Sequence, residues 1–450
     1  MLQPLSPRSG SVSRRRFIAA SLAAAGLAAT IDPLAALAQG RGNGRGSAAG
    51  YGPLVTDPNG LLDLPAGFKY KLLLKQGDLL SDGRTPRPGN ADGMGAFPGP
   101  RNTTVLCLNH ELRYEGGSAF PVPPVAGDYD PQAIGGTSVV HVGPNREVLG
   151  SWISSSGTVR NCAGGQTPWN TWITCEENED VPPTNGATKP HGWCFEVDPF
   201  AALNGGTPRQ VRLDKLGRTY PEAVVVDPNT RVAYVTEDRS DGLLYRFLPA
   251  SGTRPNGFGA YATAGGELQA MSVPGLPLAN AAVVGQSYTP TWLTVPDPDG
   301  EPIRVRNQVY AGTPTRFDRG EGGWWSEVEQ AVYFDCTGGG ASGHFGQVWR
   351  YVPRTNTLTL VYKSTNPAIL DMPDNLLVLP WGDIVLCEDG TGDDYLRVLT
   401  RDGAVYDLAH NSRSEFAGAC FSTSPNTLYV NIQGVSETFA IWGPWNSERG

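Results

Sequence analysis

The fold of this chain is indicated by the stretch Val232-Ala233-Tyr234-Val235-Thr236-Glu237-Asp238-Arg239, in which a short apolar strand ends abruptly in charged residues. Segments 172–178, 384–390 and 428–434 share this layout, with acids or amides directly after the apolar run. Glu and Asp are depleted in strands and are rarely buried unpaired. A fold that brings such strand ends together crowds like charges, and bound cations offset that cost. We therefore predict a site for several metal ions at the mouth of a repeated β structure.

The composition favours an all-β fold. The 450 residues include 57 Gly and 38 Pro, and helical periodicity is nearly absent after residue 50. Short runs of Val, Ile, Thr, Tyr, Phe and Trp recur between turn clusters such as Asp227-Pro228-Asn229.

A pattern of strand, tight turn, strand with an acidic end and outer strand recurs along the chain. Its copies cover residues 102–152, 169–199, 222–249, 325–353, 375–405 and 415–442. Such repeats are typical of a β-propeller, whose inner strands converge at one end of a central channel. A β-sandwich is the alternative, but it would scatter the acidic ends. We predict one six-bladed β-propeller domain over residues 53–450, with the metal site at one end of its channel.

The N-terminal residues look like an export signal. Arg14-Arg15-Arg16-Phe17 fits the twin-arginine motif, an apolar run of 13 residues follows, and Ala36-Leu37-Ala38 fits a cleavage site. A transmembrane anchor is the alternative, but spanning a bilayer takes about 20 residues. We expect a signal peptide at residues 1–38, a flexible linker at 39–52 and a periplasmic or secreted protein. It would meet the twin-arginine export machinery without stable membrane insertion.

The charge of the chain limits its partners. The formal net charge is −9, and loss of residues 1–38, with four Arg and one Asp, makes it −12. An acidic surface disfavours nucleic acid and anionic membranes as partners. We expect a monomer that acts on a small molecule.

The kinds of ligand in these clusters suggest more than one metal. Carboxylate and amide oxygens suit Ca²⁺, whereas a Cys thiolate among carboxylates suits iron better. Cys175 is followed directly by Glu176 and Glu177. For Cys107 and Cys420, a role as small buried hydrophobic residues is the simpler interpretation. For the Glu237-Asp238 pair, a solvated turn with a local ion pair remains an alternative.

Several motifs, in their order along the chain, resemble a known family. They include Asn109-His110-Glu111, Thr174-Cys175-Glu176-Glu177-Asn178, Arg319-Gly320-Glu321-Gly322 and Cys387-Glu388-Asp389-Gly390, with further matches at residues 346–351, 430–434 and 443–445. Together with the twin-arginine signal they are similar to the PhoX-type alkaline phosphatases. The resemblance covers nearly all of the chain after residue 38.

The resemblance implies a metal-dependent hydrolase of phosphate monoesters. It implies two iron and about three calcium ions on a six-bladed propeller, linked by a bridging oxo or hydroxo group. Cys175, Glu222 and Glu321 would bind metal and take part in catalysis, and Arg319 would contact the phosphate. Further implied metal ligands are Asn109, Glu111, Glu176, Glu237, Asp238, Glu388 and Asp389.

One departure from the family pattern leaves other functions open. Where the family has His before Glu, this chain has Tyr220-Pro221-Glu222. The alternatives are a non-catalytic, metal-stabilised propeller acting as a binding or scaffold protein, a phosphodiesterase or other hydrolase on the same site, and an iron-dependent oxidoreductase.

Overall fold

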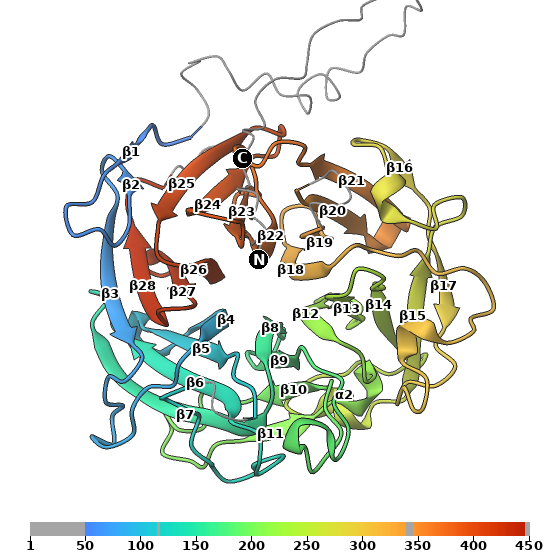
Figure 1. Ribbon diagram of the computed structural model, residues 1–450, viewed down its shortest axis with the longest axis horizontal. Helices are drawn as coiled ribbons and strands as arrows, with labels where there is room; N and C mark the ends of the chain where they lie inside the picture. The colour runs from blue at the N-terminus through green and yellow to red at the C-terminus, as the bar shows by residue number, and fades with distance from the viewer. Residues whose placement is uncertain (1–49, 115–117, 339–344, 446–450) are drawn as a thin grey trace, which may run out of the picture.

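The computed structural model describes residues 50–114, 118–338 and 345–445. Its strands form six antiparallel sheets arranged in a ring, together with one small two-stranded sheet of β1 (Leu54–Val55) and β2 (Leu64–Pro65) (Figure 1). The predicted all-β, six-bladed β-propeller is confirmed. The proposed signal peptide at residues 1–38 lies outside the described residues, as does nearly all of the linker.

Each blade begins with the strand nearest the centre of the ring. The first blade contains β4 (Ala91–Pro98), β5 (Thr104–His110), β6 (Gly135–Val142) and β7 (Val148–Thr158). The second contains β8 (Asn161–Gln166), β9 (Trp172–Glu176), β10 (Cys194–Val197) and β11 (Gln210–Arg212). The third contains β12 (Pro221–Val226), β13 (Ala233–Glu237), β14 (Tyr245–Pro249), β15 (Gly266–Ser272) and β17 (Thr291–Thr294).

The remaining blades follow the same order. The fourth contains β18 (Gly320–Ser326), β19 (Ala331–Cys336), β20 (Gln347–Val352), β21 (Thr357–Lys363) and β16 (Ser287–Tyr288). The fifth contains β22 (Pro373–Val378), β23 (Ile384–Glu388), β24 (Asp394–Leu399) and β25 (Val405–Asn411). The sixth contains β26 (Phe416–Thr423), β27 (Asn426–Ile432), β28 (Glu437–Trp442) and β3 (Lys69–Lys75).

Helical structure in the described residues is short. It comprises α2 (Ala260–Thr263) and the 3-10 turns η1 (Pro100–Asn102), η2 (Thr184–Gly186), η3 (Asp214–Leu216), η4 (Ala279–Ala281), η5 (Val305–Asn307) and η7 (Pro353–Thr355). Within the described part of the chain, none of the helices has the length and apolar character needed to cross a bilayer.

The ring is closed by a strand from the N-terminal end of the domain. Strand β3 pairs antiparallel with β28, from Lys69 opposite Trp442 to Lys75 opposite Glu437. The buried guanidinium of Arg87 donates hydrogen bonds to the carbonyls of Leu74 and Ser436, on either side of this junction. Charge-assisted bonds of this kind hold the two ends of the chain together.

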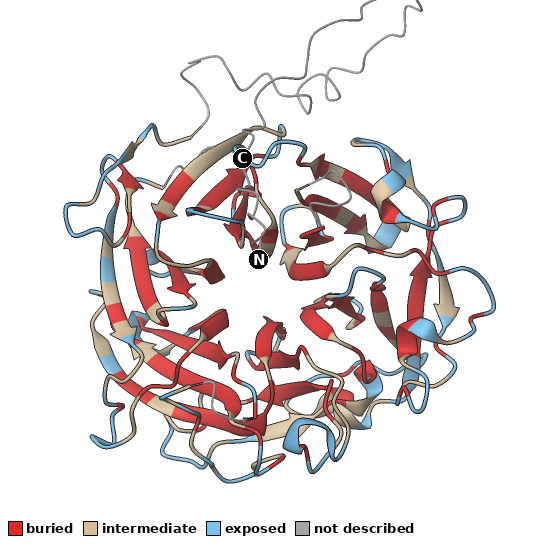
Figure 2. Ribbon diagram, in the orientation of Figure 1, coloured by how far each residue is buried: buried red, intermediate tan, exposed pale blue. Residues whose placement is uncertain are grey.

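The core lies between the faces of neighbouring blades rather than in one central mass. Between the fifth and sixth blades Val385 packs near Phe416, and between the third and fourth Tyr234 lies in one cluster with Trp349. Figure 2 shows that the strands around the centre of the ring are mostly buried, whereas exposed residues lie in the peripheral loops. The side chains that point to the centre are therefore carried by buried inner strands.

Candidate metal centre

Titratable side chains gather where the six inner strands begin. The second residue of the inner strand is acidic or Cys in five blades, and in the sixth Glu415 stands one residue before β26. We call these residues the inner ring: Asp92, Cys162, Glu222, Glu321, Asp374 and Glu415. A second ring is formed by the first residue after the second strand of each blade: Glu111, Glu177, Asp238, Thr337, Asp389 and Gln433.

A β-bulge includes the inner-ring position in the first five blades. The register between the first and second strands shifts between Ala91 and Met94 in the first blade and at the corresponding place in the next four, whereas in the sixth blade it shifts between Ala417 and Cys420, beyond Glu415. Bulges at the rim of a β structure re-aim side chains and interrupt the ladder. Glycines beside them allow close approach of the inner strands. A Cβ on Gly322 would lie 2.5 Å from the amide nitrogen of Leu376.

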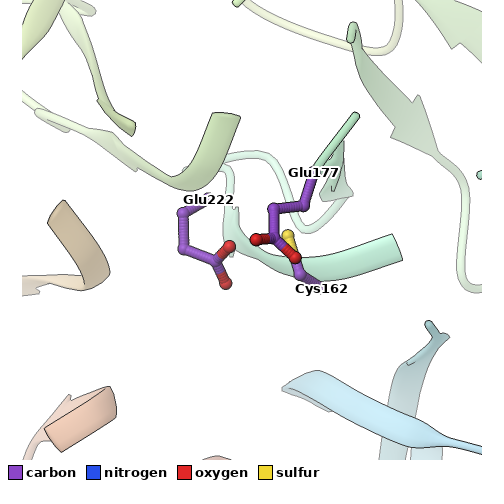
Figure 3. Close-up of side chains that lie close together, drawn as sticks. All are labelled: Cys162, Glu177 and Glu222. Carbon is purple, nitrogen blue, oxygen red and sulfur yellow. The ribbon is translucent and has the colours of Figure 1, made fainter. Parts of the chain in front are cut away.

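Two groups of ligand atoms meet at the centre. The thiol of Cys162 and the carboxylates of Glu177 and Glu222 lie within 4.8 Å of one another (Figure 3). The carboxylates of Glu222, Glu321 and Asp374 form a second such group. Sulfur with oxygen suits iron, and an all-oxygen group suits Ca²⁺, so the donor chemistry fits the metals that the sequence predicts.

Pairs of carboxyl groups lie close together in the two rings. Glu177 lies beside Asp238, Glu321 beside Asp374 and Asp389 beside Glu415. Like charges this close repel one another, and bound cations would offset that repulsion.

The pKa values of these groups follow from burial and mutual repulsion. Burial, together with Asp389 and Asp238, raises the pKa of Asp374 to about 7. Burial and the neighbours Asp389, Asp374 and Asp92 raise the pKa of Glu415 to about 11. Burial and neighbouring carboxylates likewise hold the pKa values of Asp92, Glu222 and Glu321 well above their ordinary range. Perturbed acids collected in one place are typical of functional sites.

Two arginines stand at equivalent places beside the rings. Arg160 and Arg319 each precede an inner strand and have left-handed backbones, with φ of 47° and 59°. Non-glycine residues rarely adopt this conformation, and it clusters at functional sites.

Both guanidinium groups are held by second-ring acids. Arg319 donates to Asp238 at 2.8 Å and to the inner-ring acid Glu321 at 2.7 Å. Arg160 donates to Glu111 at 2.8 Å, pairs with Glu177 and donates to the Tyr220 hydroxyl at 2.5 Å. The Arg319 side chain is 30% exposed. It can therefore bind an anion that enters the ring.

The sequence matches the family model of alkaline phosphatase PhoX over residues 49–435. This chain belongs to the PhoX alkaline phosphatase family. Members of the PhoX family are metal-dependent, which agrees with the donor groups at the centre of the propeller.

A solved structure of a PhoX protein shows the same fold. The structure titled Pseudomonas fluorescens PhoX in complex with vanadate, a transition state analogue, is 17% identical to this PhoX-family chain. It matches with a TM-score of 0.62 over 85% of this chain and 96% of that chain. Virginiamycin B lyase from Staphylococcus aureus is 10% identical, with a TM-score of 0.40 over 83% and 99% of the two chains. A comparison with curated proteins gives no match.

About half of the residues that the sequence singles out lie at the rings of this PhoX-family protein. Glu222 and Glu321 belong to the inner ring. Glu111, Asp238 and Asp389 belong to the second ring, and Arg319 contacts both rings.

The other predicted ligands lie elsewhere. Glu176 binds His191, Glu237 pairs with Arg306 and accepts a bond from Tyr245, and Glu388 pairs with Arg397. These three acids are the last residues of their strands, and consecutive side chains along a strand face opposite ways. In each blade the following residue is the one that reaches the rings.

Asn109 and Cys175 also point away from the rings. Asn109 donates to the carbonyls of Cys162 and Ala163 and so fixes the start of β8. The thiol of Cys175 lies 3.6 Å from that of Cys194 within the apolar core. The structure thus puts Cys162, rather than Cys175, beside the carboxylates of Glu177 and Glu222.

Sequence reasoning missed several ring residues of this PhoX-family protein. They are Asp92, Cys162, Glu177, Asp374, Glu415 and the adjacent Arg160. One usable signal was present in four inner strands, where the ring residue is followed by glycine or alanine: Asp92-Gly93, Cys162-Ala163, Glu222-Ala223 and Glu321-Gly322. These segments are poor in the bulky residues that mark a strand.

Proposed function

We propose that this protein is a metal-dependent phosphatase that hydrolyses phosphate monoesters at the two rings. The observation that carries the proposal is Arg319, a partly exposed arginine held by Asp238 and Glu321 at the edge of a crowded carboxylate centre. If the metals served only to stabilise the protein, an arginine directed at the metal site would bring no advantage. Membership of the PhoX family supports the same activity.

The ring residues divide naturally between two kinds of metal. Cys162, Glu177 and Glu222 would hold iron, because their donors combine sulfur with oxygen. Glu321 and Asp374, with Asp92, Asp389 and Glu415, would hold calcium through oxygen alone. Bound cations supply Lewis acidity, which offsets the charge of a phosphoryl group in the transition state. We propose the complement that the family resemblance implies: two irons, about three calcium ions and a bridging oxo or hydroxo group.

The protein's own contribution is positioning. Arg319 offers a planar set of donors that suits two oxygens of one phosphate, and Asp238 and Glu321 fix its orientation. The guanidinium stays charged at any working pH. Its attraction for the phosphoryl group therefore strengthens as negative charge builds on the equatorial oxygens. The vanadate in the Pseudomonas fluorescens PhoX structure, a transition state analogue, supports phosphoryl chemistry on this fold.

Cation binding also displaces protons. Burial and neighbouring carboxylates raise the pKa values of Glu177, Glu321 and Glu415. Ligands must be deprotonated to bind metal, so loading the site releases their protons.

We further propose that the protein works in the cell envelope, in the periplasm or after secretion. The twin-arginine motif at residues 14–17 and the site after Ala38 support this. Expression with and without residues 1–38, followed by fractionation, tests it. Export that does not depend on Arg14 and Arg15 would contradict it.

A p-nitrophenyl phosphate assay tests the function. We expect hydrolysis at alkaline pH that a calcium chelator abolishes and that Arg319→Ala lowers about 100- to 1,000-fold. Arg350→Ala is the matched control, because Arg350 pairs with Glu329 away from the rings. A folded, metal-loaded protein that hydrolyses no phosphate monoester would overturn the proposal in favour of a non-catalytic propeller.

A further inference from the structure

A polar cavity of about 690 Å³ lies directly beside the rings. Arg160 and Tyr220 line it, and Arg160 also contacts the ring acids Glu111 and Glu177. Arg160 and its partner Tyr220 therefore connect the cavity to the centre. Binding of a bare phosphate at the rings would make no use of the cavity.

One wall of the cavity is a loop that the fold holds firmly in place. Asn178, Asp180 and Asn185 line the cavity from the segment between β9 and β10. Asp180 accepts side-chain bonds from both asparagines, at 3.1 and 2.9 Å. The end of the same segment is fixed by His191, which is fully buried between Glu176 at 2.6 Å and Asp130 at 3.2 Å. A ligand would thus meet a preformed wall.

Another part of the lining contains a hydroxyl without a partner. Tyr114 lines the cavity and is 6% exposed, and its ring packs edge-on against His191. The Tyr114 hydroxyl is buried and has no hydrogen-bond partner in the described part of the chain. A buried polar group of this kind costs stability unless something satisfies it. A ligand hydroxyl that reached it would satisfy it.

The lining also indicates which kind of ligand would fit. Among the described lining residues, Arg113 and Arg304 are balanced by Glu179 and Asp180, and none is Leu, Ile, Val, Met or Phe. Balanced charges give no preference for a second anionic group. The absence of apolar side chains from this described lining disfavours aryl or alkyl groups, which gain affinity mainly by apolar burial. Amides, carboxylates and tyrosines instead suit a neutral group rich in hydroxyls.

We propose that the cavity binds the sugar of a sugar phosphate while its phosphate lies at the rings. The proposal rests on the proposed phosphatase function and adds the class of substrate. Arg160 and Tyr220 would lie at the junction between the two parts of the ligand, and Tyr114, Asn178, Asp180 and Asn185 would contact the sugar hydroxyls.

Binding calorimetry on the metal-loaded protein tests the cavity without relying on turnover. The probes are glucose 6-phosphate and inorganic phosphate, and the variants are Tyr114→Phe and the control Tyr362→Phe. Tyr362 is buried in the outer part of the fourth blade, so its variant also removes one tyrosine hydroxyl. Because the Tyr114 hydroxyl has no partner, we expect Tyr114→Phe to fold with unchanged or higher Tm.

The result depends on the ratio of the two affinities. We expect wild type and Tyr362→Phe to bind glucose 6-phosphate more tightly than phosphate. In Tyr114→Phe, the ratio of the affinity for glucose 6-phosphate to that for phosphate should fall about 3- to 10-fold. The ratio of kcat/KM for glucose 6-phosphate to that for p-nitrophenyl phosphate should fall in parallel. Glucose 6-phosphate that binds no more tightly than phosphate, or an equal loss for both probes in Tyr114→Phe, overturns the cavity assignment. Tighter binding without hydrolysis of either ester overturns the phosphatase function and leaves the cavity assignment standing.

Discussion

Glu176 and Glu177 are adjacent in the chain, yet their carboxylates serve different structures. Glu177 lies with Cys162 and Glu222 at the centre of the propeller. Glu176 is fully buried on the other side, where it binds His191 and accepts hydrogen bonds from the amides of Gly192 and Trp193. The alternation of side chains along a strand separates an acid of the second ring from a structural one by a single residue.

This separation predicts opposite effects for two matched variants. Glu177→Gln should lower bound iron and phosphatase activity, because it removes a ring ligand. Glu176→Gln should keep its metal but lower the free energy of unfolding by about 1–3 kcal/mol, because it weakens charge-assisted bonds to buried partners. Metal content by mass spectrometry and thermal unfolding check both. Metal loss in Glu176→Gln alone would show that the assignment is reversed.

The two central cysteines should also differ. Cys162→Ala should lose iron and most activity, since the Cys162 thiol lies with Glu177 and Glu222. Cys175→Ala should retain both, because its thiol contacts Cys194 in the apolar core. The metal-to-protein ratio of each purified variant decides between them. An iron-free but folded Cys175→Ala protein would return the ligand role to Cys175.

Removal of cations should make the protein sensitive to alkaline pH. In the folded chain the pKa of Asp374 is raised to about 7 and that of Glu415 to about 11 by burial and neighbouring carboxylates. Carboxyl groups with raised pKa values bind more protons folded than unfolded. Stability then falls as pH rises from the ordinary carboxyl range through these values, by about 1.4 kcal/mol per pH unit and proton.

The corresponding measurement is Tm at pH 6 and pH 9, with and without a chelator. We expect the chelator to lower Tm more at pH 9, where the crowded carboxylates are more fully charged. Equal shifts at both pH values would mean that the ring acids do not repel one another strongly enough to matter.

His191 should stabilise the fold mainly at low pH. Burial alone would lower its pKa, but Glu176 and Asp130 outweigh burial and raise it above the ordinary 6.5. A raised histidine pKa gives stabilisation that is complete below about 6.5 and is lost as pH rises through the folded value. His191→Gln should therefore cost more stability at pH 5.5 than at pH 9, as measured by chemical unfolding. A cost that does not change with pH would show that His191 is neutral in the fold.

Much of the fold could be predicted from local pattern. The apolar runs before Glu237-Asp238 and Glu388-Asp389 are second strands of blades, and the recurrence of such units predicted the propeller. The closing strand Lys69–Lys75 could not be predicted in this way. Its partner β28 is more than 350 residues away, and nothing in its local pattern specifies that pairing.

The site was predictable in kind but only partly in detail. Strand-end acids and the family resemblance pointed to Glu222, Asp238, Arg319 and Glu321, all of which lie at the rings. Cys162 was missed because its strand, Asn-Cys-Ala-Gly-Gly-Gln at 161–166, has no apolar alternation. Residues 161–166 form a strand because of their pairing with a neighbouring strand and the bulge. Their own residue types do not favour one.

The sequence by itself determined the repeated β units, the surplus of acids at their strand ends and the family to which the chain belongs. Only the tertiary structure decided which of two consecutive acids reaches the centre and which cysteine accompanies them. The physical reason is that a bulge and the phase of a pleat depend on pairing between strands. Those pairings, and the charges they crowd together, exist only once the ring has closed.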